Sequence, residues 1–249
     1  MPKGNWAGAQ QLRHTAASRW LLAVVLAGMN AAILPTMLKP LAVSAAIPVS
    51  PESESGWDNI LKPLARKKRP LGSRGGLCAL TPARLGTKTE LWNLRPLFVW
   101  QGAVSQIAVR PVGKAEVLWR YTPTSTHTTQ PYSQASYDGS PLQPGQTYEW
   151  LIFDQFAGPS SEPTLILPFH VMDASIRSTI TTQLQTLETN LQKQSASAEI
   201  TAQQRTKFFV DRQLPADALQ TVFAVKTPST SLKQAIQTLP SQLCKASGG

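Results

Sequence analysis

The central part of the chain consists of short apolar or alternating segments separated by turn-forming residues. These segments are rich in Val, Ile, Leu, Trp, Tyr and Phe, and Pro, Gly, Asp and Ser bound them. In one of them Tyr148, Trp150 and Ile152 occupy alternate positions and therefore share one face of a strand. Such short segments favour an antiparallel sandwich over an α/β sheet. The pattern predicts strands at residues 77–80, 97–100, 107–112, 117–121, 148–153 and 164–171.

After residue 172 the hydrophobic period changes from two to about 3.6, which is typical of a helix. Asp173 is a suitable N-cap for the first helical segment. The apolar residues of that segment fall on one helical face, at Ile176, Ile180, Leu184, Leu187 and Leu191.

Three shorter amphipathic segments follow. In the first, the inner side is expected to carry Ile200, the apolar stem of Gln204, Phe208 and Phe209. The second covers residues 215–225. The third carries Leu232, Ile236 and Leu239 and is expected to end at Pro240. None of these segments buries its apolar face alone. The chain is therefore predicted to be mainly β plus α, with a module of about four short helices over residues 173–249 after a sandwich over residues 77–172.

The N-terminal segment has the order of a secretory signal peptide. Lys3, Arg13 and Arg19 precede an apolar run over residues 20–34, and small residues follow at 42–46. The run is short for a bilayer span of about 20 residues. We predict a signal peptide over residues 1–46 and an exported protein, periplasmic or extracellular. The alternative is an uncleaved segment that anchors the chain to the inner membrane.

A basic, proline-rich linker is predicted over residues 47–76. Its proline spacing argues against regular structure, although Trp57 and the pair Ile60 and Leu61 offer a way to dock it on the core. The densest charge of the chain lies here, at Arg66, Lys67, Lys68 and Arg69. This run is either a solvated linker or an electrostatic patch for an anionic partner.

The charge balance argues against a nucleic-acid partner. The chain has 24 basic and 14 acidic residues and a formal net charge of +10. Four of the basic residues and none of the acidic ones lie in residues 1–46, so cleavage leaves +6. The predicted sandwich holds six residues of each sign and is neutral.

The two cysteines, Cys78 and Cys244, lie near the two ends of the mature chain. In an oxidising compartment they form one bridge across a long loop, or they are two unrelated thiols. The chain has no CxxC pair and no Cys/His cluster, so we expect no metal and no cofactor.

Two motifs resemble those of fibronectin type III and related immunoglobulin-like domains. Residues 96–100 (PLFVW) are similar to the strand whose Trp anchors the core, and residues 142–148 (LQPGQTY) are similar to the tyrosine corner. The resemblance covers residues 90–172 and implies an antiparallel immunoglobulin-like sandwich. It departs from the antibody type because no second Cys lies within the domain.

Several tryptophans are candidates for stacking on a sugar ring. Trp100 and Trp150 are expected in the core, which leaves Trp92 and Trp119 as possible ligand contacts or as further core residues. The tract over residues 122–136 is expected to be a long exposed loop and a candidate contact surface.

The chain lacks a recognisable catalytic constellation. Of its histidines, His14 lies in the signal segment, His127 in the Thr-rich tract and His170 at a strand end, where Asp173 is its nearest acid in sequence. No nucleophile elbow, zinc motif or phosphate loop occurs. A glycoside hydrolase requires two facing carboxylates, and the candidates are Asp138, Glu149, Asp154 and Glu162.

Taken together, the chain resembles uncharacterised exported proteins of cyanobacteria. The resemblance rests on the residues around Cys78, Trp92, Trp100 and Trp150 and on residues 217–220, and it implies architecture and export only. We expect a non-catalytic binding or scaffolding protein of the cell envelope that contacts a protein partner. The alternatives are polysaccharide binding through exposed Trp and a wall-active hydrolase.

Overall fold

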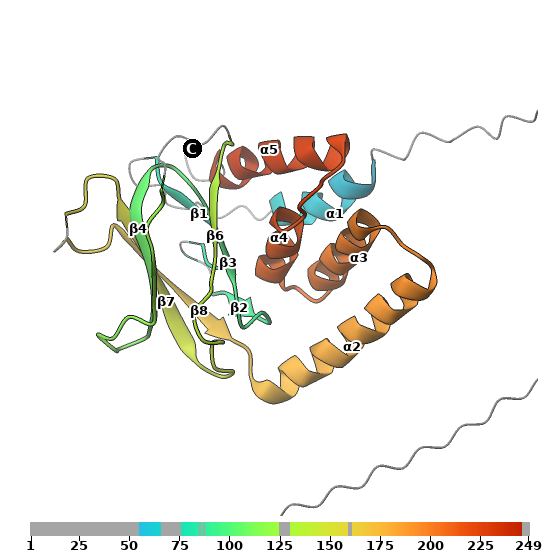
Figure 1. Cartoon of the computed structure of the whole chain (residues 1–249), viewed down its shortest axis with the longest axis horizontal. Helices are drawn as coiled ribbons and strands as arrows, with labels where there is room; N and C mark the ends of the chain where they lie inside the picture. The colour runs from blue at the N-terminus through green and yellow to red at the C-terminus, as the bar shows by residue number, and fades with distance from the viewer. Residues whose placement is uncertain are drawn as a thin grey trace, which may run out of the picture. The chain divides into compact units, whose positions relative to one another are not determined.

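Two β-sheets face each other, and helices cover one of them (Figure 1). The structure is a computed structural model that describes residues 55–65, 76–84, 86, 88–124, 130–158 and 161–245. All of them belong to one unit, Val49–Gly249. The predicted signal peptide and the basic run Arg66–Arg69 lie outside the described residues.

The smaller sheet is antiparallel, with the strand order β1-β3-β6. Its strands are β1 (Cys78–Thr81), β3 (Leu97–Gln101) and β6 (Ser133–Ser136). The larger sheet is mixed, with the order β2-β8-β7-β4-β5, because β2 runs parallel to β8. Its strands are β2 (Glu90–Leu91), β4 (Val104–Pro111), β5 (Trp119–Tyr121), β7 (Thr147–Asp154) and β8 (Leu165–Val171). The predicted mixed β and α class is confirmed.

Each of the six predicted strands overlaps an observed strand, but two observed strands were not predicted. Strand β6 lies within the tract expected to be a loop, and that expectation is wrong for its four residues. Only Ala135 of this strand is buried, and its Ser and Gln neighbours carry no apolar pattern. Strand β2 has two residues, which is too short for a periodic signal.

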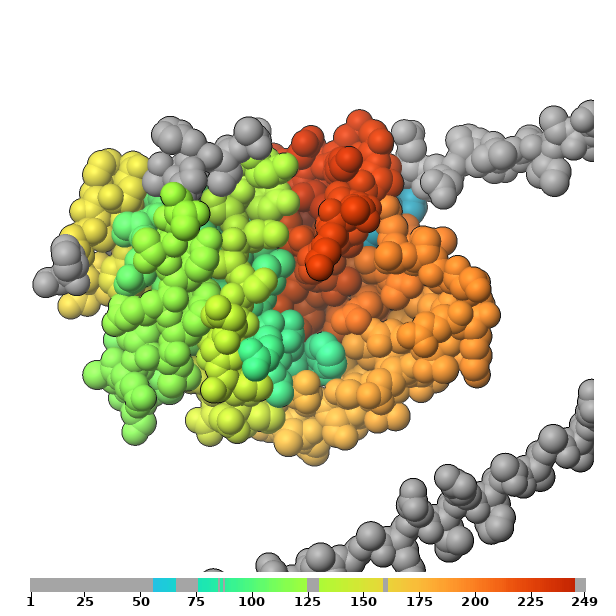
Figure 2. Space-filling model, in the orientation of Figure 1, coloured from blue at the N-terminus to red at the C-terminus, as the bar shows by residue number. Residues whose placement is uncertain are grey.

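The smaller sheet is buried on both faces. All four residues of β1 are buried. Ala79, Phe98 and Trp100 join the hydrophobic cluster shared with the larger sheet. Leu80 and Val99, whose side chains point to the other face, join a second cluster with the helices. The smaller sheet is therefore the middle of three layers, and Figure 2 shows the strand and helix regions in continuous contact.

The helices beside the smaller sheet come from both ends of the chain. They are α1 (Ser55–Ala65), α2 (Ala174–Lys193), α3 (Ala198–Asp211), α4 (Pro215–Phe223) and α5 (Thr230–Lys245). Of these, α4 and α5 contact the strands of the smaller sheet. Helix α1 occupies part of the predicted linker, so the expectation of irregular structure is wrong there. Trp57, Leu61 and Leu64 are spaced to share one helical face, and all three are buried among the other helices.

Two details of the helical region differ from the prediction. Helix α5 continues through Pro240 to Lys245, because Leu243 is buried beyond the proline and Cys244 is bonded to β1. Ile200 was expected to point inward, but it is 46% exposed, and α3 instead buries Thr206 together with the two phenylalanines.

A disulfide joins the first strand to the last helix. Sγ of Cys78 in β1 is bonded to Sγ of Cys244 in α5, and the two residues are 166 positions apart. The bond links the middle layer to the helical layer and reduces the conformational entropy of the unfolded chain.

Polar side chains of α4 hold the loop between β2 and β3. The two carboxylate oxygens of Asp217 accept hydrogen bonds from the backbone N–H groups of Trp92 and Asn93, at 2.9 and 3.0 Å. Oε1 of Gln220 accepts from the Asn93 side chain and from the Leu97 backbone, both at 3.1 Å. Both side chains are buried. We call these four bonds the α4 clamp.

Burial raises the pKa of Asp217 to about 7. Desolvation, which disfavours the carboxylate, outweighs the hydrogen bonds from backbone N–H groups and the charge of Arg177, which favour it. In the unfolded chain an Asp titrates near pH 3.9. The folded state therefore binds the proton more tightly, and the stability contributed by this group is complete below about pH 4 and is lost as the pH rises through about 7.

The substitution Asp217→Asn removes this titration and keeps the shape of the side chain. From about pH 4 to about pH 8, the wild type should lose up to roughly 4 kcal/mol of unfolding free energy relative to Asp217→Asn. Urea unfolding of both proteins across this range measures the difference. A difference that stays constant with pH contradicts the assignment.

Replacing both cysteines tests the contribution of the disulfide. Because the bond closes a loop of about 170 residues, Cys78→Ser with Cys244→Ser should lower the unfolding free energy by about 5 kcal/mol. Chemical denaturation measures the loss. A reducing agent should have a similar effect on the wild type and none on the double variant, and equal stability of wild type and variant would count against the estimate.

Candidate functional site

Trp92 packs at the junction between the sheets and the helices. Its indole N–H donates to Oγ1 of Thr181 at 3.1 Å, and its ring centroid lies 5.6 Å from that of Phe209. The guanidinium of Arg177 lies over the ring, 5.3 Å from the centroid. These contacts give Trp92 a role in joining the two regions.

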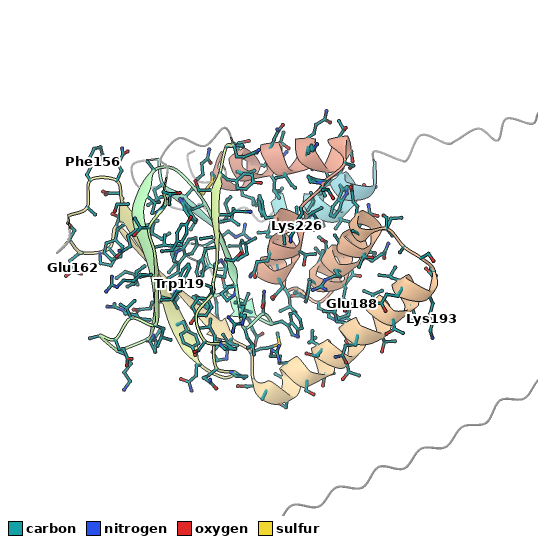
Figure 3. All side chains as sticks on the ribbon, in the orientation of Figure 1. Trp119, Phe156, Glu162, Glu188, Lys193 and Lys226 are labelled. Atoms are coloured by element: carbon teal, nitrogen blue, oxygen red, sulfur yellow. A yellow bond between two sulfur atoms is a disulfide. The ribbon has the colours of Figure 1, made fainter. Side chains whose placement is uncertain are left out.

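Trp119 lies in the core between the two sheets (Figure 3). It is 8% exposed, and its ring stacks on Phe98 and Tyr121 at centroid distances of 5.2 and 6.1 Å. Its indole N–H donates to Asp138. Of the two interpretations open for this residue, burial favours core packing over a ligand contact.

The candidate catalytic acids are separately engaged. Glu149 forms an ion pair with Arg110 at 2.7 Å, and Asp138 accepts the bond from Trp119. Asp154 accepts from the hydroxyl of Thr164 and from the Phe156 backbone. In these contacts of the described residues, each of the three acids is paired with a donor and none with another carboxylate.

Glu162, His170 and Asp173 are the remaining acid and histidine candidates among the described residues. Glu162 is exposed on the connection between β7 and β8, on the same loop as Phe156 (Figure 3). Nδ1 of His170 lies 3.1 Å from Oγ1 of Thr147, and Asp173 occupies the N-cap position of α2. His14 and His127 lie outside the described residues.

Neither a metal centre nor a membrane span is found in the described part of the chain. Within it, no three or more His, Cys, Asp and Glu side chains gather closely enough to hold a metal ion. Among the same residues, no helix combines the length and the hydrophobicity needed to cross a membrane.

Two adjoining cavities lie where the chain passes from β1 to β2. Their volumes are about 560 and 540 Å³, and both are lined by Arg84, Lys88, Thr89 and His170. The first extends along β8, past Ile166 to Phe169 and Thr147. The second extends to the start of α4, at Gln213, Pro215, Ala216 and Leu219. We call the combined space the edge cleft.

The edge cleft carries basic side chains at its centre. Lys88 is exposed and Arg84 is half-buried, and burial lowers the pKa of the Arg84 guanidinium. Glu90 is the acidic residue among those lining the cleft. An anion in this space would pair with the exposed Lys88 beside Arg84.

One wall of the cleft is an open edge of the larger sheet. The backbone N–H of Val171 donates to Gln146 on the β7 side, whereas that of His170 donates to Thr89 on the opposite side. Alternate residues of a strand direct their backbone groups to opposite neighbours. The backbone groups of Ile166 and Pro168 therefore point away from β7, as the N–H of His170 does. Strand β2 pairs only with His170 and Val171, so among the described strands none covers the edge at Ile166 and Pro168.

Comparisons with known proteins leave this site to be interpreted from its own chemistry. No protein-family model matches the chain, and no curated protein or solved structure matches it either. The resemblance to exported cyanobacterial proteins stays a prediction.

Most residues of the edge cleft were not singled out from the sequence. His170 was considered only as a catalytic candidate, and Arg84 and Lys88 stand in a segment without hydrophobic periodicity. The cleft combines segments more than 100 residues apart, such as Lys88 and Gln213. The signal that was present is a pair of basic residues within a predominantly neutral sandwich.

Pro168 protects the open edge, because it lacks the N–H that would face a neighbouring strand. The substitution Pro168→Thr supplies this donor and a residue that favours strands, so it should increase self-association at a given protein concentration. Sedimentation velocity measures the shift. Ile166→Thr, which changes the same edge without adding a donor, is the matched control, and no increase for Pro168→Thr relative to it would contradict this role.

Proposed function

We propose that this chain is a non-catalytic, exported binding protein whose edge cleft holds an extended, acidic segment of a protein partner. The observation that carries the proposal is the coincidence of an open strand edge with basic side chains. Ile166 and Pro168 line the same cavity as Arg84 and Lys88.

The open edge supports a peptide as the bound group. An extended peptide beside β8 would bond the outward backbone groups of Ile166 and the carbonyl of Pro168. The missing N–H of Pro168 removes one bond, so binding depends more on side chains. The Ile166 side chain, which is 42% exposed, offers an apolar contact.

The side chains of the cleft favour an acidic peptide over an acidic polysaccharide. Lys88 and Arg84 provide cations for carboxylates. Sugar rings are commonly held against exposed aromatic faces, and the aromatic residue that lines the cleft, Phe169, is only 1% exposed. A polysaccharide would therefore gain charge pairing and little stacking.

Export is part of the proposal. Its first support is the basic, apolar and small-residue order of residues 1–46. Its second support is the disulfide between Cys78 and Cys244, because such bonds persist in oxidising compartments.

We also propose that the two sheets form an immunoglobulin-like sandwich. The order β1-β3-β6 corresponds to strands A, B and E, and β8-β7-β4-β5 corresponds to G, F, C and C′. Near the start of β7, the hydroxyl of Tyr148 accepts a hydrogen bond from the Gln143 backbone at 2.8 Å, as a tyrosine corner would. Trp100 of β3 lies in the core, 1% exposed.

Binding of a defined peptide tests the function. The probe is a blocked eight-residue peptide that alternates Glu and Val, and its affinity is measured by isothermal titration calorimetry. Lys88→Glu should weaken binding by about tenfold or more, because it replaces attraction by repulsion at an exposed position. Lys88→Ala should have a smaller effect in the same direction.

The matched control is Lys193→Ala, which removes one positive charge from the last turn of α2. Helix α2 starts just after β8, and its 20 residues place Lys193 about 30 Å from that start (Figure 3). Affinity should be unchanged in this variant. If the Lys88 variants bind the peptide as tightly as the wild type does, or if the protein binds polygalacturonate in preference to the peptide, the proposal is overturned.

A further inference from the structure

A separate cavity of about 280 Å³ lies beside the smaller sheet, next to β5 and β6. Its volume is close to the lower limit of about 300 Å³ for ligand pockets. Trp100, Tyr121 and Tyr132 form its aromatic walls, and Thr124, Ser133 and Gln134 are among its polar residues. Among the described residues that line it, none is acidic, basic or a histidine.

The aromatic walls are held by other aromatic rings. Tyr121 stacks on Trp119 and meets Trp100 edge to face, at centroid distances of 6.1 and 6.4 Å. Tyr132 packs against Phe223 of α4 at 4.9 Å. Tyr121 and Tyr132 nevertheless remain half-buried, unlike Trp100, which is 1% exposed. The two tyrosines therefore offer rigid, partly accessible surfaces whose orientation is fixed before a ligand arrives.

We propose that this cavity binds one ring of an uncharged sugar. The C–H groups of such a ring suit the tyrosine surfaces, and its hydroxyls suit amide and hydroxyl side chains, which both donate and accept hydrogen bonds. The described lining residues would offer no counter-ion to a charged ligand. Burial raises the pKa of Tyr132, which keeps its hydroxyl protonated.

This site is distinct from the edge cleft, with which it shares no lining residue. Trp92 and Trp119, the candidate sugar contacts predicted from the sequence, are not among its lining residues. Thr124, Ser133 and Gln134 of the polar tract after residue 121 line it, and β6 brings Ser133 opposite Trp100.

Saturation-transfer NMR with the full chain tests the proposal. The probes are glucose and its tetramer cellotetraose, and glucuronic acid is the matched charged sugar. Glucose or cellotetraose should bind more tightly than glucuronic acid. Binding of both neutral probes points to a single ring as the bound unit, and binding of cellotetraose alone points to a glycan chain. No binding of either neutral probe, or preference for glucuronic acid, overturns the proposal.

Two variants locate the site. Tyr132→Ala should weaken binding by about fivefold or more. Since Tyr132 also packs on Phe223, Gln134→Ala is the second variant. Gln134 is exposed, and a loss of about threefold is expected. Gln192→Ala on α2 is the exposed control. If Gln134→Ala and a folded Tyr132→Ala both bind the sugar as tightly as the wild type does, the assignment is overturned. Lys88→Glu, in the edge cleft, should leave sugar binding unchanged.

Discussion

The burial of the smaller sheet on both faces is the constraint on which the rest of the structure depends. Packing against the larger sheet buries only one face of the smaller sheet. Its other face carries Leu80 and Val99, which would be exposed to water without the helices. The five-stranded sheet covers one side and the helices cover the other. The change from strands to helices after residue 172 is therefore a change of secondary structure within one packed unit. Helix α1, near the start of the described chain, packs into the helical layer. The disulfide attaches α5, at its end, to β1 of the smaller sheet.

The α4 clamp turns this packing into a defined position for the edge cleft. Asp217 and Gln220 hold the backbone just after β2, and β2 in turn pairs with the end of β8. A buried carboxylate is costly to desolvate, as the raised pKa of Asp217 indicates, so this clamp contributes more to geometry than to net stability. It fixes the relation between the open sheet edge and the start of α4, the two sides of the cleft.

Local pattern was sufficient for the elements that bury a regular face, and insufficient elsewhere. Alternation at Tyr148, Trp150 and Ile152 marks β7, and the spacing of Leu184 and Leu191 marks α2. Strand β6 has one buried residue, and α1 contains Pro63, so neither has a clear signal of its own. Asp217 resembles an ordinary acidic residue in the first turn of a helix. Its burial depends on contacts with Trp92 and Asn93, more than 120 residues away, which no local pattern contains.

We infer that the sheets and helices form one cooperative unit, which positions the edge cleft and the aromatic cavity. Hydrogen exchange followed by mass spectrometry in increasing urea tests it directly, because each segment reports its own opening free energy. Peptides from β4 and β7 and peptides from α4 and α5 should lose protection at the same urea concentration, both with the disulfide intact and in the double Ser variant. Loss of protection in α4 and α5 while β4 and β7 remain protected would contradict the account.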